Sequence, residues 1–367
     1  MIKLARPEIG AAEIDAVARV LETGMLVEGV NVAAFETAVG RYTGARHAIA
    51  VSSGTAALHL ALVAVGVGPG DEVIVPGFTF PASANVIELA GAVPVLVDID
   101  LATFNLDPAA LERLVTPRTR AIMPVHLFGQ SAEMDVVAAV ARAHGLKVVE
   151  DAACALGARY RGRACGALSD AGCFSFHPRK VITTGEGGMV LTDDDKLAER
   201  LRLLRNLGFS KPRFYHEVPA FNFRMTGYQA AMGLAQFRKI DHILSEKRRI
   251  AVTYNHYLSD INGLQLPYEA NWARNVYWMY GVVVHPDFGI SRDDLMQQLH
   301  EAGIDTRTFF CPMNQQPCLQ SRPGFREVPC PIADGLWQKG LYLPSTYTLS
   351  EDAIKQIADT VRLAHRN

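Results

Sequence analysis

AGCFSFHPRKVITTGEGGMVLT, residues 171–192, joins two short apolar runs through a polar loop rich in glycine. The runs at 171–177 and 187–192 have the length and composition of buried β-strands. Strands that are apolar on both faces lie in sheets covered by helices on both sides. The whole pattern therefore predicts an α/β fold with a mixed, mostly parallel sheet. Similar strand-like runs occur upstream, at residues 47–53, 71–77, 93–99, 120–129 and 146–153, and helical spacing alternates with them at 54–66, 82–91, 107–115 and 134–145.

The rest of the chain predicts a second, smaller domain with its own sheet. We expect a large domain over residues 1–245, which includes an N-terminal arm, and a compact C-terminal α/β domain over residues 246–367. The stretch 226–261 can form one long helix or two joined ones. The other patterns downstream of the quoted stretch are a helix at 194–208, a strand at 276–284 and helices at 291–303 and 350–366.

Composition excludes several classes of function. The chain has 367 residues, 49% of them hydrophobic, and a formal net charge of −2. Acidic and basic residues are mixed along the chain, so we expect no nucleic-acid partner. The N-terminus lacks the apolar core of a signal peptide, and no apolar run approaches the ~20 residues of a membrane helix. The six cysteines fit no CxxC pair and no zinc ligand set, so we expect reduced thiols, no metal site and a cytoplasmic enzyme.

Ser53, Gly54 and Thr55 follow the first strand-like run and precede a helical stretch. The first amides of a helix have no internal partners and carry the positive end of its dipole. Gly54 lets a ligand approach the backbone, and the two hydroxyls can add hydrogen bonds, so this loop is a candidate phosphate site. Taken alone, the same residues are more often an ordinary helix cap.

Asp151 lies at the end of the apolar stretch LKVVED (146–151), and Lys180 lies in the loop of the opening stretch. The carboxyl ends of parallel strands are where α/β folds bind ligands. A strand-end aspartate keeps a pyridine nitrogen protonated, but it can equally cap the next turn. Lys180 is one of nine lysines, and an isolated lysine is usually a surface charge. Its place between two apolar strands puts it at the same sheet edge as Asp151, where Ser175 can add a hydroxyl to a bound phosphate.

Six stretches carry a resemblance to a known family. Their order and spacing resemble those of the nucleotide-sugar aminotransferases of the DegT/StrS family, which are fold type I pyridoxal-phosphate (PLP) enzymes. The resemblance implies that Lys180 forms a Schiff base with PLP and shuttles protons as general base and acid. It implies that Asp151 pairs with the pyridinium nitrogen, and that pyridoxamine phosphate (PMP) is the intermediate form of the cofactor. The stretches are VSSGTAALHLAL (51–62), PGFTFPASANVI (76–87), PVHLFGQ (124–130), VVEDAACALGA (148–158), FSFHPRKVITTGEGG (174–188) and FNFRMTGYQAA (221–231).

The same resemblance assigns the remaining contacts with the cofactor. Phe80 would stack on its ring. Asn222 would reach the phosphate from a neighbouring subunit, which implies a homodimer with shared active sites. The residues that would hold the phosphate within one chain are Ser53, Gly54, Thr55 and Ser175.

Three residues depart from the pattern of the family. Cys154 stands where many relatives have Gln or Glu, near the phenolic oxygen of the cofactor. Met25 replaces a frequent tryptophan and Asn314 a frequent histidine, and both, with Phe309, are candidates for contact with the substrate. The changes can tune substrate choice or be neutral drift. The stretches 276–284 and 303–317 look most like perosamine synthases, which aminate C4 of a GDP-linked 4-keto-6-deoxy sugar.

The resemblance implies a two-stage reaction. L-Glutamate leaves its amino group on the cofactor and departs as 2-oxoglutarate, and a nucleotide-linked keto sugar then takes up the amino group. One alternative is a PLP-dependent sugar dehydratase of the same fold, but such relatives replace the lysine with histidine. Another is a non-catalytic regulator or sugar-binding protein, which degenerate residues at Lys180, Asp151 or the phosphate loop would favour. All three positions are intact.

Overall fold

A seven-stranded sheet forms the centre of the molecule. In the computed structural model, which describes residues 1–322, 324–325 and 328–366, its strand order is β1-β9-β8-β5-β4-β2-β3. β9 is antiparallel to both of its neighbours, and the other paired strands are parallel. The predicted α/β fold with a mixed, mostly parallel sheet is confirmed. The strands are β1 (His47–Val51), β2 (Glu72–Pro76), β3 (Val93–Val97), β4 (Thr119–Ile122), β5 (Lys147–Asp151), β8 (Ala171–Ser175) and β9 (Gly188–Thr192).

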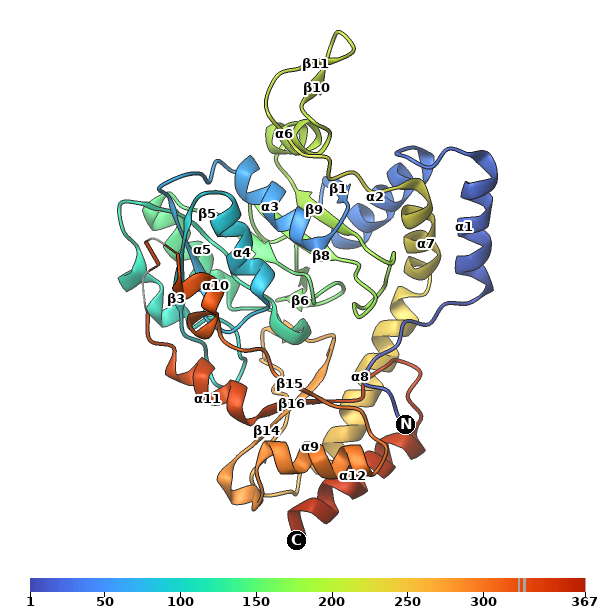
Figure 1. Cartoon of the computed structure of the whole chain (residues 1–367), viewed down its shortest axis with the longest axis vertical. Helices are drawn as coiled ribbons and strands as arrows, with labels where there is room; N and C mark the ends of the chain where they lie inside the picture. The colour runs from blue at the N-terminus through green and yellow to red at the C-terminus, as the bar shows by residue number, and fades with distance from the viewer. Residues whose placement is uncertain (323, 326–327, 367) are drawn as a thin grey trace.

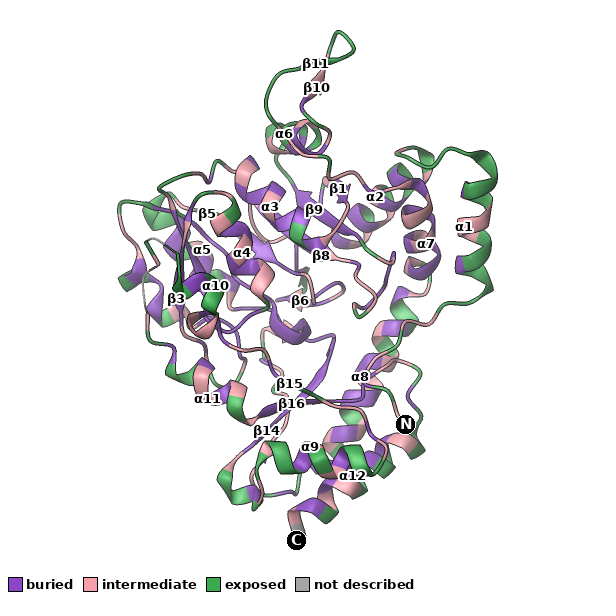
Figure 2. Ribbon diagram, in the orientation of Figure 1, coloured by how far each residue is buried: buried purple, intermediate pink, exposed green. Residues whose placement is uncertain are grey.

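Helices cover the sheet on both sides, and the strands between them are almost wholly buried (Figure 2). The stretch 226–261 forms two helices, because Lys239 leaves helical geometry between them. Two further helices, α1 and α2, precede the sheet and pack against α7 (Figure 1). The helices of this part are α1 (Ala11–Thr23), α2 (Val30–Thr43), α3 (Gly54–Ala64), α4 (Pro81–Leu89), α5 (Met134–His144), α6 (Asp195–Arg205), α7 (Gly227–Phe237) and α8 (Ile240–Leu258).

The prediction of an α-helix over residues 107–115 is wrong in the type of helix. Two 3₁₀ turns, η1 (Pro108–Ala110) and η2 (Glu112–Leu114), occupy this stretch. Leu111 and Leu114 are both buried, and a spacing of three residues matches the period of a 3₁₀ helix.

β1 is an edge strand, and side chains protect its open edge. The backbone N–H of Ala50 donates to Glu36 Oε1 at 2.8 Å, and its carbonyl oxygen accepts from Arg205 Nη1 at 2.9 Å. Glu36 and Arg205 also form an ion pair at 2.8 Å, and a second carboxylate, Glu28, lies 2.7 Å from Arg205. The pair therefore takes the place of a neighbouring strand at this position.

A second hydrophobic core lies in the C-terminal part. It is built on an antiparallel four-stranded sheet of order β12-β14-β16-β15. α8 runs between the cores, since Ile243 belongs to the first and Ile250 to the second. The expected boundary at 245/246 therefore falls within this helix and stays a prediction. The elements here are β12 (Leu264–Gln265), β14 (Tyr280–Val284), β15 (Arg307–Thr308), β16 (Gly340–Leu343), α9 (Arg292–Glu301), α10 (Pro317–Gln320), α11 (Pro331–Lys339) and α12 (Glu351–Arg366).

Two details of this part differ from expectation. The strand expected at 276–284 begins only at Tyr280, because Tyr277 has a φ of 47° and cannot lie in extended backbone. The first residues of the chain also belong here, since Ile2 pairs with Ile304 and packs against the second core. The N-terminus and α12 accordingly lie close together in Figure 1.

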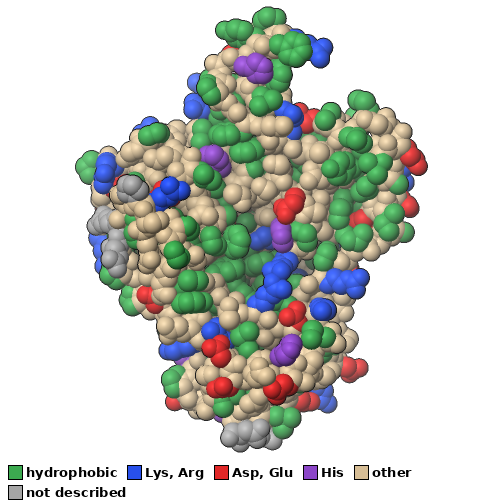
Figure 3. Space-filling model, in the orientation of Figure 1, with side chains coloured by type: hydrophobic (Ala, Val, Ile, Leu, Met, Phe, Trp, Pro, Cys, Tyr) green, Lys and Arg blue, Asp and Glu red, His purple; other side chains and the backbone are tan. Residues whose placement is uncertain are grey.

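A hairpin projects from the sheet domain beyond α6 (Figure 1). Its strands are β10 (Phe209–Ser210) and β11 (Tyr215–His216), and its hydrophobic side chains are visible at the tip in Figure 3. Phe214 is 71% exposed there. A small sheet of β6 (Arg159–Tyr160), β7 (Arg163–Ala164) and β13 (Ala273–Arg274) completes the fold. Among the described residues, every helix is too short or too polar to cross a bilayer.

Candidate active site

Three of the predicted site segments meet at one edge of the central sheet. Asp151 is the last residue of β5, Ser175 is the last residue of β8, and Ser53 follows β1 by two residues. β1 and β8 are both antiparallel to β9, so they run in the same direction as each other and as β5. The loop from Phe176 to Gly187, which carries Lys180, begins at this edge.

The loop before α3 has the features of an anion site. Ser53 is the N-cap, and its Oγ accepts from the backbone N–H of Ala56 at 3.0 Å. This is the ordinary capping role, and it leaves the earlier amides of the first turn without a helical acceptor. A Cβ at Gly54 would lie 2.6 Å from the Cβ of Ser175, so only glycine fits between the two segments. Thr55 is exposed beside them.

Lys180 reaches back across the end of β5. Its Nζ lies 3.2 Å from Cys154 Sγ and 4.3 Å from the centre of the Trp278 indole ring. The indole is held in turn, since its Nε1 donates to the carbonyl oxygen of Arg179. Burial raises the pKa of the Cys154 thiol, an effect that the nearby ammonium of Lys180 opposes. Lys180 thus lies between a neutral thiol and an aromatic face.

Asp151 is 5% exposed, and its carboxylate has two hydrogen bonds. One oxygen accepts from the hydroxyl of Ser83 at 2.7 Å, and the other accepts from the backbone N–H of Ala153 at 3.1 Å. Each carboxylate oxygen can accept two hydrogen bonds, so capacity remains for a further donor. The backbone of Asp151 is fixed on both sides, by Pro124 and His126.

Phe80 and Asn222 are exposed. Phe80 is 58% exposed, and its ring lies 5.7 Å from that of Phe310. Asn222 lies near the carboxyl end of β1, because the backbone N–H of Ser52 donates to the carbonyl oxygen of Phe223 at 2.8 Å. The reach of Asn222 into a second subunit stays a prediction.

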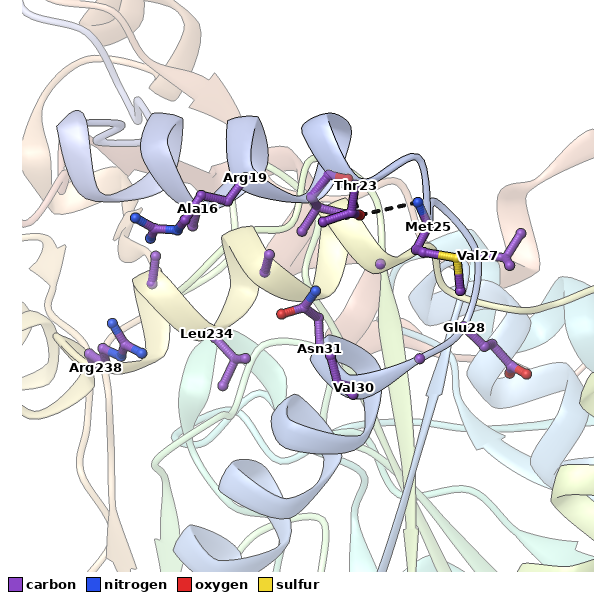
Figure 4. Close-up of a pocket in the computed structure, with 15 residues that line it drawn as sticks. Ala16, Arg19, Thr23, Met25, Val27, Glu28, Val30, Asn31, Leu234 and Arg238 are labelled. Atoms are coloured by element: carbon purple, nitrogen blue, oxygen red, sulfur yellow. Dashed lines mark hydrogen bonds between the residues drawn. The ribbon is translucent and has the colours of Figure 1, made fainter.

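The three candidate substrate residues are dispersed in one chain. Phe309 is 2% exposed and packs between Phe128 and Tyr342 at 5.1 and 4.8 Å. Asn314 donates through Nδ2 to Asp334 at 3.0 Å. Met25 is exposed and lines a groove of about 600 Å³ between α1, α7 and the start of α2 (Figure 4). Lys180 lines a different, smaller cavity, so a single chain does not bring Met25 and Lys180 into one pocket.

Sequence reasoning missed four residues around this site. Ser83 contacts Asp151, and Trp278 contacts Lys180. Lys247 donates to the carbonyl oxygen of Trp278 at 2.9 Å. The buried hydroxyl of Tyr342 has no hydrogen-bond partner among the described residues, and burial raises its pKa well above the usual value. Only Ser83 carried a usable signal, because a serine in the first turn of a helix after a buried strand can reach the same sheet edge.

The arrangement fits PLP on the chemistry of its donors. An amine for the aldehyde, a buried carboxylate for the ring nitrogen and a helix N-terminus for the phosphate lie at one sheet edge, at Lys180, Asp151 and Gly54. Glycine at position 54 lets the start of α3 pack closely against the end of β8, which brings the hydroxyl of Ser175 beside the first turn of α3. An exposed aromatic ring, Phe80, stands beside them.

Comparisons with known proteins agree with this fit. A family model described as the DegT/DnrJ/EryC1/StrS aminotransferase family matches residues 7–362. The chain is 45% identical to GDP-perosamine synthase of Caulobacter vibrioides, over 97% of this chain and 96% of that protein. The structure of S. venezuelae DesV superposes with a TM-score of 0.92 at 38% identity, covering 97% of this chain and 95% of that one. Spr1654 of Streptococcus pneumoniae, solved in a PLP-form, superposes with a TM-score of 0.93 at 28% identity over 100% and 98% of the two chains.

The fold, the site and these relatives together define a PLP-dependent sugar aminotransferase. The chain belongs to the DegT/DnrJ/EryC1/StrS aminotransferase family.

Proposed function

We propose that this enzyme transfers an amino group from L-glutamate to the keto carbon of a nucleotide-linked 4-keto-6-deoxy sugar, as a step in polysaccharide or glycoside biosynthesis. The observation that carries the proposal is the placement of both Lys180 and Asp151 at one sheet edge, beside a loop suited to a phosphate. The perosamine-type sugar rests on likeness to two proteins named GDP-perosamine synthase, at 45% and 35% identity. The cytoplasm is the proposed location, since the six cysteines are free thiols.

Lys180 is the proposed catalytic residue. PLP, when bound, supplies an electron sink for the carbon that gains or loses a proton. The Nζ of Lys180 would hold the cofactor covalently at rest, and as a free amine it would take up a proton and return it. The neutral thiol of Cys154 and the face of Trp278 give this amine a place to lie when it is released.

Asp151 and the phosphate loop would orient the cofactor. The carboxylate of Asp151 would accept from the protonated ring nitrogen and keep it charged. Amides of the first turn of α3 would bind the phosphate, with hydroxyls from Ser53, Thr55 and Ser175. Phe80 would cover one face of the ring, and Asn222 of a second copy would complete the phosphate site in a homodimer.

The substrate contacts are proposed from fewer observations. Cys154 lies nearest to the amine and can discriminate between groups next to the reacting carbon. Met25 would contribute from its groove, Asn314 from a loop already tied to Asp334, and Phe309 from within an aromatic cluster. These four residues are where we expect sugar specificity to reside.

A panel of nucleotide-linked keto sugars tests the proposal. The purified protein with PLP and L-glutamate should convert a GDP-linked 4-keto-6-deoxy sugar into a product that mass spectrometry identifies as the amino sugar, with one 2-oxoglutarate formed per product. Loss of a hydroxyl without 2-oxoglutarate would identify the dehydratase instead. Tight binding of sugars without turnover of any of them would identify a sugar-binding or regulatory protein.

A further inference from the structure

Asp151 receives a hydrogen bond from a residue that lies 68 positions earlier in the chain. Ser83 Oγ donates to Asp151 Oδ2 at 2.7 Å, and the same hydroxyl lies 2.9 Å from Thr79 Oγ1. Thr79 and Ser83 are 1% and 0% exposed. Buried hydroxyl groups in proteins nearly always have a hydrogen-bond partner. Thr79, Ser83 and Asp151 provide such partners for one another within the folded core.

The direction of this hydrogen-bonded chain follows from the acceptor at its end. An ionised carboxylate only accepts, so the single hydrogen of Ser83 is committed to Asp151. The oxygen of Ser83 is then the acceptor for the hydroxyl of Thr79. A second donor to Ser83 polarises its O–H bond, so the two hydroxyls act on the carboxylate together.

The helix that carries Ser83 adds to the effect. α4 begins at Pro81, so Ser83 lies in its first turn, where the dipole of the helix is positive. The loop before α4 is anchored by Phe78, which is fully buried among aromatic rings. The same loop carries the exposed Phe80. One rigid segment therefore presents a ring to the proposed face of the cofactor and a donor to the carboxylate beneath it.

We infer that Ser83, supported by Thr79, is a positioning residue that holds Asp151 ionised and oriented towards the ring nitrogen of PLP. The inference rests on the proposed role of Asp151. A hydroxyl donor stabilises the charged form of a buried carboxylate, and hydrogen bonds to charged groups are the stronger kind. Ser83 does not itself touch the cofactor.

Several titratable side chains adjoin Asp151. The backbone N–H of His126 donates to the carbonyl oxygen of Asp151, and the ring of His126 lies 2.9 Å from the carboxylate of Glu150. Cys154 and Cys173 both interact with the charge of Asp151, and burial raises the pKa of both thiols. Neither thiol changes charge in the acid range.

The test compares PLP binding by Ser83→Ala, Thr79→Val and the matched control Ser131→Ala, a buried serine whose hydroxyl donates to the carbonyl oxygen of Ala132 and interacts with the thiol of Cys165, away from Asp151. Binding of PLP is titrated from pH 5 to pH 8. Ser83→Ala should bind PLP about tenfold more weakly at pH 7, and its affinity should fall at a pH about one unit higher on acidification. Removing a donor makes the carboxyl easier to protonate, hence the shift to higher pH. Thr79→Val should show a smaller shift, Thr79→Ser none, and Ser131→Ala none.

A second readout separates charge from packing. The ¹⁵N resonance of labelled ring nitrogen in bound PLP should move towards the unprotonated position in Ser83→Ala and stay in place in Ser131→Ala. The inference would be overturned if Ser83→Ala matched the wild type in PLP affinity, in the pH at which that affinity falls, and in the ¹⁵N resonance. Asp151 would keep its proposed role in that case. PLP binding that is unchanged in Asp151→Asn, or absent from the wild type, would overturn the proposed function and the inference with it.

Discussion

The amine of Lys180 makes weaker contacts than the carboxylate of Asp151 does. A thiol and an indole face hold its amine, whereas Asp151 is fixed by a hydroxyl and a backbone amide. The difference suits their proposed tasks, because the amine must leave its place and return, while the carboxylate must stay. Cation–π contacts at partly exposed sites are worth only about 0.5–1 kcal/mol, which allows such movement.

Replacement of the amine tests that role directly. Lys180→Ala should abolish amine transfer, with turnover below a thousandth of that of the wild type, since it removes the amine proposed to hold the cofactor and move the proton. The fold should be retained, because Lys180 is only half-buried and its amine contacts a thiol and an indole face rather than a carboxylate. Turnover is followed by 2-oxoglutarate release and the fold by circular dichroism. Substantial activity in the variant would end the assignment.

A second buried lysine predicts a pH effect on stability. Burial lowers the pKa of Lys247 to about 7 from its usual 10.5, and its Nζ donates to the carbonyl oxygens of Trp278 and Ser345. Between pH 7 and pH 10 the unfolded chain therefore holds a proton that the folded chain has lost. Folded-state stability should rise with pH across this window, by about 1.4 kcal/mol per unit.

Lys247→Met isolates this contribution. The difference in unfolding free energy between the wild type and the variant should grow in favour of the wild type by about 2–3 kcal/mol from pH 7 to pH 9. Urea denaturation at each pH measures it. A difference that stays constant over this range would show that Lys247 titrates normally in the folded protein.

The positions of Lys180 and Asp151 could be predicted from sequence because both are tied to strand ends. Their partners could not. Ser83 and Trp278 approach them from 68 and 98 residues away, and no local pattern encodes which helix turn or loop meets a given strand end. Met25 illustrates the same limit. Its correspondence to a frequent tryptophan of the family could be seen in the sequence, but its position in a groove separate from the cavity of Lys180 could not.

At the scale of helices and strands, the main feature is the protection of the open edge of β1. β1 carries the phosphate loop at its end, and the Glu36–Arg205 pair covers its open side. Arg205→Met should lower the free energy of unfolding by about 3 kcal/mol or more, because it leaves two carboxylates without their partner. Arg202→Met, on the exposed face of the same helix, should change it little. Equal stabilities of the two variants in denaturant would refute the role of the pair.

Close packing of two elements predicts the effect of a single methyl group. Gly54→Ala would place a Cβ 2.6 Å from the Cβ of Ser175, so β8 and α3 must separate at the phosphate loop. We expect PLP binding to weaken at least about tenfold. Gly68→Ala is the matched control, since a Cβ there meets nothing within 4 Å. Titration with PLP measures both, and equal affinities would remove the loop from the phosphate site.

All seven strands of the central sheet were predictable in position, because each contains a short apolar run, but the run expected over residues 120–129 is a strand only to Ile122 and ends in a 3₁₀ turn at Leu127–Gly129. Two other elements were not predictable. Residues 107–115 have helical spacing but form two 3₁₀ turns, and the strand at 276–284 is shortened by the positive φ of Tyr277. In both cases tertiary contacts of buried side chains override the local preference.

At the scale of the whole molecule, the proposed homodimer makes a specific prediction. If Asn222 serves the site of its partner, Lys180→Ala and Asn222→Ala subunits should complement each other. A mixed dimer would contain one site with both residues intact, so two inactive preparations should regain up to about a quarter of wild-type activity after mixing and refolding. Absence of any recovery, with mixed dimers confirmed by native mass spectrometry, would place Asn222 in its own chain's site.

The central claim is that Lys180 is the amine that holds PLP and yields it to an amino donor. Borohydride reduction of the PLP-loaded protein, followed by peptide mass spectrometry, tests this most directly. We predict a reduced PLP adduct on Lys180, which disappears when the protein is incubated with L-glutamate before reduction. An adduct on another lysine, or one on Lys180 that glutamate leaves unchanged, would contradict the account.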